Sequence, residues 1–196
     1  MATSQRRLSS PESSPRATYD LRLAPLPVRA ARLMLSGRLR AARPGNLQPE
    51  PGQSRPEPVE GQPSWHRQYP LPDSIDAIAM LFAAHRAMLG AVGESPKWWI
   101  HQIVVDDVVV GDIGFHGPPS PELAVEIGYS VVPAWRGRGV ASRACALILQ
   151  QAWQDGADTV VAETDADNVV SQTVLLRNGF QRHPDGVFFI NRPEVR

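Results

Sequence analysis

Hydrophobic and polar positions follow two periods along this chain, one of two residues and one of three to four residues. Alternation and short apolar runs predict strands over residues 21–23, 99–105, 108–115, 124–132, 159–163 and 186–191. Helical spacing of apolar residues predicts helices over residues 28–39, 75–90, 140–155 and 168–178. Asp73-Ser74 supplies an N-cap for the second helix, Asp106-Asp107 closes a hairpin, and Gly179 ends the last helix. A meander followed by alternating strands and helices predicts a single α/β domain with a mixed sheet.

Two stretches lack either period. Residues 1–18 are rich in Ser and Arg with no apolar stretch after them, which favours a disordered tail over a transit peptide. Residues 43–72 hold eight of the 19 prolines and few periodic apolar residues, which indicates a loose insertion. An extended partner-binding segment is the alternative for this insertion. The folded domain is therefore expected over residues 19–196.

Composition narrows the classes of partner. Twenty basic and 20 acidic residues give a formal net charge of zero, so nothing in the overall field favours nucleic acid or an anionic membrane. The apolar runs are far shorter than the ~20 residues that span a bilayer. Cys145 is the only cysteine, which rules out an internal disulfide and fits a reducing compartment. These features predict a soluble, cytoplasmic protein.

The segment from Ala124 to Ala141 carries the strongest chemical signal. A strand containing Glu126 passes through a Pro/Trp turn into Arg136-Gly137-Arg138-Gly139-Val140-Ala141, which opens a helix. The glycines let the backbone approach a bulky anion, and the first helical N–H groups point toward it. A phosphate cradle beside a carboxylate predicts group transfer from a phosphate-bearing cofactor.

These residues resemble the GNAT N-acetyltransferase superfamily. Arg136-x-x-Gly139-x-Ala141 is similar to its acyl-CoA pyrophosphate loop, and Asn168-x-x-Ser171 followed by Gly179-Phe180 is similar to its second signature. Val110 to Phe115 is similar to the preceding strand in the branch that includes ribosomal-protein N-terminal acetyltransferases. The resemblance implies a mostly antiparallel central sheet flanked by helices. It also implies acetyl-CoA as co-substrate and direct transfer of the acetyl group to a primary amine in a ternary complex.

Transfer to an amine calls for a base. A Lys-like amine has a pKa near ~10.4, so removing its proton at pH 7 costs about 4.6 kcal/mol. Alternation places Glu126, Gly128 and Ser130 on one face of their strand. By its position Glu126 matches the family's general base, which takes the proton directly or through water. The alternative is a surface carboxylate paired with an Arg.

The resemblance also implies cofactor contacts. Main-chain groups of Ser130, Val131 and Val132 match those that bind the pantetheine arm and the oxyanion, and residues 136–141 match the loop around the pyrophosphate. Asn168 matches a residue that holds pantetheine or a water, although a simple N-cap is the alternative. Many relatives carry a Tyr acid where this chain has Leu175, so Ser171 is the nearest substitute.

Other chemistry is less well supported. Trp98-Trp99 and Trp135 suit either an acceptor pocket or packing, and Cys145 lies on the apolar stripe of its helix. The five histidines show no paired metal-ligand spacing, so no metal is expected. A Rossmann turn is excluded because Ser142 stands where the third glycine belongs, and a P-loop because no Gly-Lys-Ser/Thr follows.

Two functions remain open at this point. The first is an N-acetyltransferase whose acceptor is a ribosomal-protein or other N-terminus, a small metabolite amine or an amino-sugar drug. The second is a catalytically idle relative that holds acyl-CoA and acts through protein partners. Homodimers are common in proteins of this kind, so a homodimer is compatible with either function.

Overall fold

A computed structural model describes residues 19–35, 63–84 and 96–194 of the chain. Its strands are β1 (Leu21–Pro25), β2 (Ser64–Trp65), β3 (Ile100–Val105), β4 (Val108–Phe115), β5 (Ala124–Val131), β6 (Thr159–Ala162), β7 (Gln181–Arg182) and β8 (Phe188–Asn191). Its helices are α1 (Val28–Leu35), α2 (Pro72–Ala84), α4 (Val140–Gln154) and α5 (Val169–Arg177), with a short 3₁₀ helix at Pro133–Trp135.

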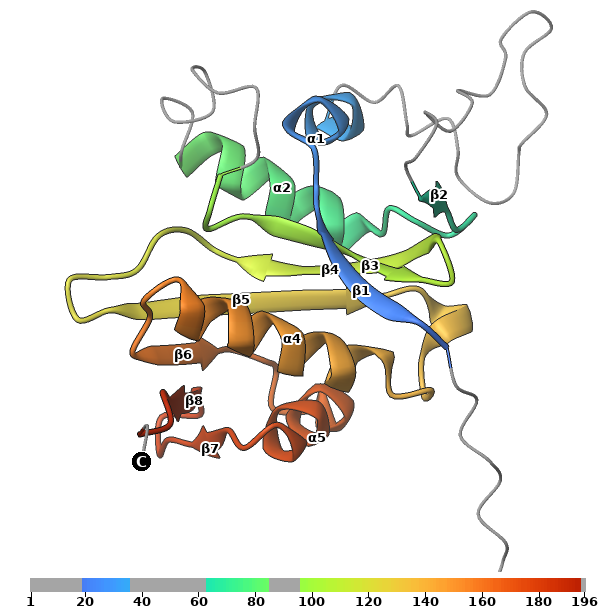
Figure 1. The fold of residues 1–196 in the computed structure, drawn as a ribbon. Helices are drawn as coiled ribbons and strands as arrows, with labels where there is room; N and C mark the ends of the chain where they lie inside the picture. Colours follow the sequence, from blue (N-terminus) through green and yellow to red (C-terminus); the bar gives the residue numbers. More distant parts are fainter. Residues whose placement is uncertain (1–18, 36–62, 85–95, 195–196) are drawn as a thin grey trace, which may run out of the picture.

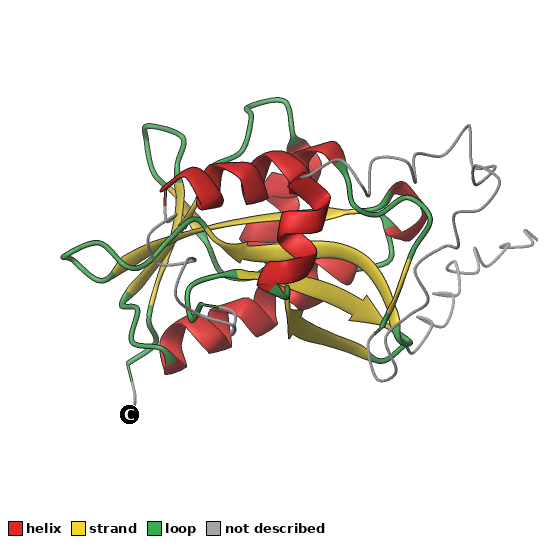
Figure 2. Cartoon of the chain, turned by 90° about the horizontal axis from the view of Figure 1, so that it is seen from above, coloured by secondary structure: helices red, strands yellow, loops and turns green. Residues whose placement is uncertain are grey.

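The strands form one sheet in the order β1-β3-β4-β5-β6-β8-β7, and β2 pairs with β4 off this path. The pairs β5–β6 and β2–β4 are parallel and the others are antiparallel. Figure 2 shows the sheet running between helices on its two faces. The expected fold, a mixed and mostly antiparallel sheet flanked by helices, is confirmed.

The core explains the sequence pattern of the central strands. Residues 109–115 of β4 are buried throughout, because helices cover both faces of the middle of the sheet. On β5 the burial alternates, with Val125, Ile127 and Val131 buried. Burial of one such aliphatic side chain contributes roughly 1.5–3 kcal/mol, so the apolar face of β5 holds the strand against α4.

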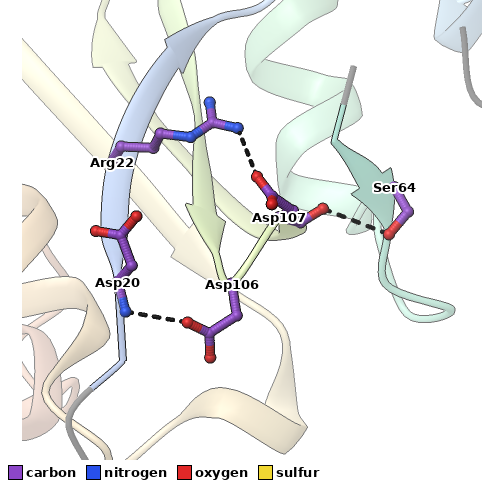
Figure 3. A network of polar contacts seen from close by, with 5 residues as sticks. All are labelled: Asp20, Arg22, Ser64, Asp106 and Asp107. Carbon is purple, nitrogen blue, oxygen red and sulfur yellow. Dashed lines mark hydrogen bonds and ion pairs between the residues drawn. The ribbon is translucent and has the colours of Figure 1, made fainter. Parts of the chain in front are cut away.

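The turn between β3 and β4 ties together segments that are distant in sequence (Figure 3). Asp106 and Asp107 have φ of 45° and 61°, as a two-residue hairpin turn requires. The Asp106 carboxylate accepts a hydrogen bond from the backbone N–H of Asp20 at 3.0 Å, and Asp107 pairs with Arg22 at 3.0 Å. The carbonyl of Asp107 accepts from the N–H of Ser64 at 3.0 Å. The predicted hairpin is confirmed, and its turn anchors both β1 and β2.

Several boundaries differ from the sequence-based expectation. Residues 63–72 were expected in a loose insertion, but β2 pairs with β4 and Tyr69 is buried. Helix α2 begins at Pro72, so Ser74 is not its N-cap; its hydroxyl lies 3.0 Å from that of Ser130 on β5. The strand β7 was not predicted, because two residues carry no period. The tail 1–18 and residues 36–62 and 85–95 lie outside the described residues.

Strands β5 and β6 separate partway along their length. They pair only where residues 124–126 face residues 159–161. Beyond Glu126, β5 continues to Val131 beside β4 without a neighbour in β6, as the long β5 and short β6 in Figure 1 show. This separation opens the middle of the sheet.

Candidate active site

A cavity of about 410 Å³ lies where β5 and β6 separate. Its walls are residues 127–129 of β5, residues 162–165 at the end of β6, and Asn168, Ser171 and Leu175 of the α5 region. The sequence-predicted Asn168 and Ser171 therefore lie together at this opening, whereas Glu126 does not line it. An extended ligand that enters between the two strands would meet free main-chain groups of β5.

The strand's hydrogen-bond pattern decides which main-chain groups are free. The N–H of Val132 donates to Val110 at 2.9 Å, and the carbonyl of Glu126 accepts from the N–H of His116 at 2.9 Å. Residues two apart on an antiparallel strand direct these groups to the same side. The main-chain groups of Ser130 and the N–H of Val132 therefore face β4, and the Val132 carbonyl accepts from the N–H of Trp135 at 2.9 Å. The contacts expected of these groups with pantetheine are not available. The main-chain groups of Ile127, Tyr129 and Val131 face the opening instead.

The loop at residues 136–139 is exposed and has room for an anion. Gly137 and Gly139 have φ of 72° and 80°, values that favour glycine, and a Cβ at either would meet nothing within 4 Å. Gly139 is the N-cap of α4 and provides no side-chain hydrogen bond to the first turn. The N–H groups that open α4 are thus left for an anion at the positive end of the helix dipole. The loop fits the phosphate groups of a CoA cofactor.

Neighbouring side chains hold this loop in place. The Arg136 Nε donates to the carbonyl of Val131 at 2.8 Å, which joins the loop to the end of β5. The Tyr19 hydroxyl donates to the carbonyl of Arg138 at 2.9 Å. The guanidinium of Arg138 lies 5.1 Å from the ring of Trp135, whose ring packs against Tyr19. Trp135 therefore packs against Tyr19 and Arg138 beside the loop.

Asn168 and Ser171 are joined at the start of α5. The Asn168 side chain accepts a hydrogen bond from the N–H of Ser171 at 3.1 Å, so Asn168 is an N-cap that also lines the cavity. The Ser171 hydroxyl lies 2.8 Å from the hydroxyl of Tyr129 on β5. Leu175 is fully buried and has no proton to donate. A phenol thus reaches the cavity wall from β5, although none is present at residue 175.

Glu126 has a partner of its own on the other face of β5. Its Oε1 lies 2.9 Å from Nδ1 of His116, the residue that follows β4. This hydrogen bond holds the pKa of Glu126 below its ordinary value, against the opposing effect of partial burial. The alternative, a surface carboxylate paired with an Arg, is wrong about the partner, because Glu126 pairs with a histidine.

The remaining aromatic and thiol groups have structural roles. Trp99 is buried and donates from Nε1 to the carbonyl of Leu26 at 2.8 Å, and Trp98 packs edge-on against Phe115. Cys145 is buried, and burial raises the pKa of its thiol to about 12. Within the described part of the chain, no group of three or more His, Cys, Asp and Glu residues is arranged to hold a metal ion. None of the helices described there is both long and apolar enough to cross a membrane.

The sequence did not predict a role at the site for three residues that lie near it: Tyr19, His116 and Tyr129. Tyr129 carries a partial signal, since alternation along β5 places it on the face opposite Glu126. His116 has a weaker one, because it stands opposite Glu126 only if the hairpin register is known. Tyr19 has none, since its contact with Arg138 joins residues that are 119 positions apart in the sequence.

Solved acetyltransferase structures share this fold. RimJ from Mycobacterium smegmatis, solved with CoA-disulfide, is 20% identical with a TM-score of 0.53, over 87% of this chain and 81% of its own. The ribosomal-protein-S5-alanine acetyltransferase from Vibrio fischeri is 16% identical with a TM-score of 0.52, over 88% and 92%. The protein yncA from Salmonella typhimurium, solved with acetyl-CoA, is 13% identical with a TM-score of 0.53, over 89% and 95%.

Sequence comparison decides the family. No protein of curated function matches the chain by sequence. The family model of the GNAT acetyltransferase domain matches residues 54–181, which is more than half of the chain. This match covers the separated strands, the loop at residues 136–141 and the α5 region. The chain therefore belongs to the GNAT acetyltransferase family.

Proposed function

We propose that this protein is an acetyl-CoA-dependent N-acetyltransferase that transfers the acetyl group directly to a primary amine. The observation that carries the proposal is the opening between β5 and β6, which continues toward an exposed loop at a helix N-terminus. Acetyl-CoA supplies the acetyl group as a thioester. The protein supplies the main-chain groups of the strand, the anion site and a carboxylate on the opposite face of β5.

Each group has a proposed role. Residues 136–141 hold the pyrophosphate. The main-chain groups of Tyr129 and the N–H of Val131 replace those of Ser130 and Val132 as contacts of the pantetheine arm and the oxyanion. Asn168 and Ser171 contact the same arm from α5, and Ser171 donates toward the leaving thiolate. Glu126 assists removal of the amine proton on the α2 side of the sheet. These roles follow from position and from the family's chemistry.

The acceptor classes remain those that the sequence predicted. They are a ribosomal-protein or other N-terminus, a small metabolite amine and an amino-sugar drug. The structures of ribosomal-protein acetyltransferases among the similar folds make an N-terminal amine the first acceptor to test. A cytoplasmic location is part of this proposal, and the buried free thiol of Cys145 is compatible with it.

Calorimetry with acetyl-CoA tests the cofactor site. The wild type is expected to bind acetyl-CoA. Gly139→Glu places bulk and negative charge in the loop and is expected to abolish this binding. Gly156→Glu is the matched control, because Gly156 follows the other end of α4, has a φ of 97° and also has open space around its Cβ. Equal loss of acetyl-CoA binding in both variants would indicate unfolding of α4. Unchanged binding by Gly139→Glu would exclude the loop as the cofactor site.

An amine screen then separates the two functions. Thiol release from acetyl-CoA is measured with short peptides that carry a free N-terminal Ala or Ser, with putrescine and with an aminoglycoside. Release that depends on one amine supports the transferase. Tight acetyl-CoA binding without release for any amine would instead favour the idle relative that acts through partners.

A further inference from the structure

His116 is held opposite Glu126 by two hydrogen bonds. Its backbone N–H donates to the carbonyl of Glu126, and its Nδ1 lies 2.9 Å from Oε1 of the Glu126 carboxylate. Both side chains are partly exposed, with 30% and 38% of their surfaces accessible. The ring is therefore fixed at the end of β4 and still reachable by a ligand.

The second ring nitrogen lies over a glycine of the cavity wall. A Cβ at Gly128 would stand 2.7 Å from Nε2 of His116, so only glycine leaves room for the ring here. Gly128 itself lines the opening between β5 and β6. Among residues 19–35, 63–84 and 96–194, none forms a hydrogen bond to Nε2. This nitrogen therefore lies against the cavity-lining Gly128, on the face of β5 that carries Glu126.

The pairing with Glu126 decides which nitrogen is basic. A neutral imidazole carries one N–H, and an N–H at Nδ1 that donates to a carboxylate leaves the lone pair on Nε2. Imidazole changes its charge between about pH 5 and 8, which suits proton transfer at neutral pH. The Glu126 carboxylate already accepts a hydrogen bond, and its lowered pKa makes it a poor proton acceptor.

We propose that Nε2 of His116 accepts the proton of the acceptor amine, and that Glu126 acts as a positioning residue that fixes the ring and stabilises its charged form. The inference rests on the proposed function. The amine nitrogen forms a bond to the acetyl carbon, and the proton that leaves the nitrogen passes to Nε2. The C–S bond breaks, and the thiolate leaves with its electron pair.

The tautomer of the ring is measured first, because it needs no acceptor. Long-range ¹H–¹⁵N NMR on the full chain is expected to show His116 protonated at Nδ1 and unprotonated at Nε2. Glu126→Gln is expected to shift the ring toward the Nε2–H form. The pair of His183 and Asp185, also 2.9 Å apart, gives a reference signal away from the site. A wild-type ring protonated at Nε2 would overturn the proposal.

Kinetics with acetyl-CoA and the best amine of the screen then test the proton transfer. His116→Ala is expected to lower kcat by about 100-fold with a nearly unchanged KM for acetyl-CoA. Added free imidazole is expected to restore part of that rate, whereas it does not restore Glu126→Gln. His183→Ala is the matched control, because it removes a ring with the same kind of partner outside the cavity.

The outcomes separate this inference from the proposed function. Wild-type kcat in His116→Ala, or a loss that imidazole does not restore, overturns the role of His116 while N-acetylation stands. If the wild type binds acetyl-CoA and acetylates none of the amines, the proposed function fails. The NMR tautomer then decides whether Nε2 carries the free lone pair that the proposal requires.

Discussion

The hydroxyl of Tyr129 on β5 lies 2.8 Å from the hydroxyl of Ser171 on α5, so a hydrogen bond joins two walls of the cavity. Burial raises the pKa of Tyr129 to about 12, and the phenol therefore keeps its proton at neutral pH. The phenol has two acceptors in Ser171, the hydroxyl at 2.8 Å and the backbone carbonyl at 3.2 Å. When the phenol donates to the hydroxyl, the Ser171 hydroxyl is free to donate in turn. The pair provides a proton donor at the cavity wall, whereas Leu175 on α5 has no proton to donate.

We expect Tyr129 and Ser171 to act as a unit. Tyr129→Phe and Ser171→Ala are each predicted to lower kcat about fivefold, since one hydrogen bond contributes about 1 kcal/mol. The double variant is predicted to lose no more than the single variants, because residues in one network are not additive. Steady-state thiol release measures all three. Thr173→Ala serves as control, because it removes a hydroxyl that donates to the carbonyl of Val169 on the same helix. If the losses in kcat of the two single variants add up in the double variant, the two residues act independently.

The contact between Tyr19 and Arg138 predicts an effect on cofactor binding. Tyr19→Phe removes the hydrogen bond that holds the loop carbonyl at 2.9 Å, and keeps the ring that packs against Trp135. The Kd for acetyl-CoA is expected to rise about fivefold, with little change in kcat at saturation. Calorimetry measures the Kd. Thr159→Val, which loses a hydrogen bond to Asn191 elsewhere in the sheet, should leave it unchanged.

The fold was largely predictable because its signals are local. The alternation along β5 and the glycines at 137, 139 and 179 determine the backbone conformation only of the residues close to them in sequence. Ser74 was misread because a hydroxyl near a helix start resembles a cap, whereas its partner Ser130 lies on a distant strand. The two-residue strand β7 is defined by its pairing with β8 and is too short to show an alternation of hydrophobic and polar residues, so the sequence pattern does not predict it.

The candidate site was predictable to a lesser extent. The loop at residues 136–141 and the Asn168 cap are encoded by neighbours, and both could be named from sequence. The main-chain roles of Ser130 and Val132 were misassigned because the direction of an N–H depends on strand register, which β4 sets. The pairs His116–Glu126 and Tyr129–Ser171 join different elements and appear only in the folded chain.

Two facing glycines predict contrasting effects of added methyl groups. A Cβ at Gly114 would lie 2.6 Å from the Ile100 Cα, which is backbone, whereas one at Gly128 would meet only the His116 ring at 2.7 Å. Gly114→Ala is therefore expected to lower the free energy of unfolding by about 1–3 kcal/mol. Gly128→Ala should cost less stability but displace the ring and alter its NMR signals. Denaturant unfolding and His116 spectra test both, and an undisturbed ring in Gly128→Ala would contradict the contact.

Asp112 on β4 predicts a pH dependence of stability. It is buried, and the loss of hydration raises its pKa from 3.8 to about 6, with the charge of Asp73 adding to the effect. Its Oδ1 accepts from Ser130 at 2.8 Å, which offsets only part of this cost. Between about pH 4 and pH 6 the folded state then holds a proton that the unfolded state has lost. The contribution of Asp112 to stability is therefore greatest near pH 4 and falls as the pH rises through 6.

Replacing this carboxyl by an amide removes the titration and keeps an acceptor for Ser130. Relative to the wild type, Asp112→Asn should gain up to about 3 kcal/mol of unfolding free energy between pH 4 and pH 7. Urea unfolding of both proteins across this range measures the difference. Asp158→Asn is the control, because the Asp158 carboxylate is exposed and lies 3.9 Å from the guanidinium of Arg192. A constant difference between Asp112→Asn and wild type at all pH values would show that folding leaves the pKa of Asp112 unshifted, because such a group adds no pH dependence to stability.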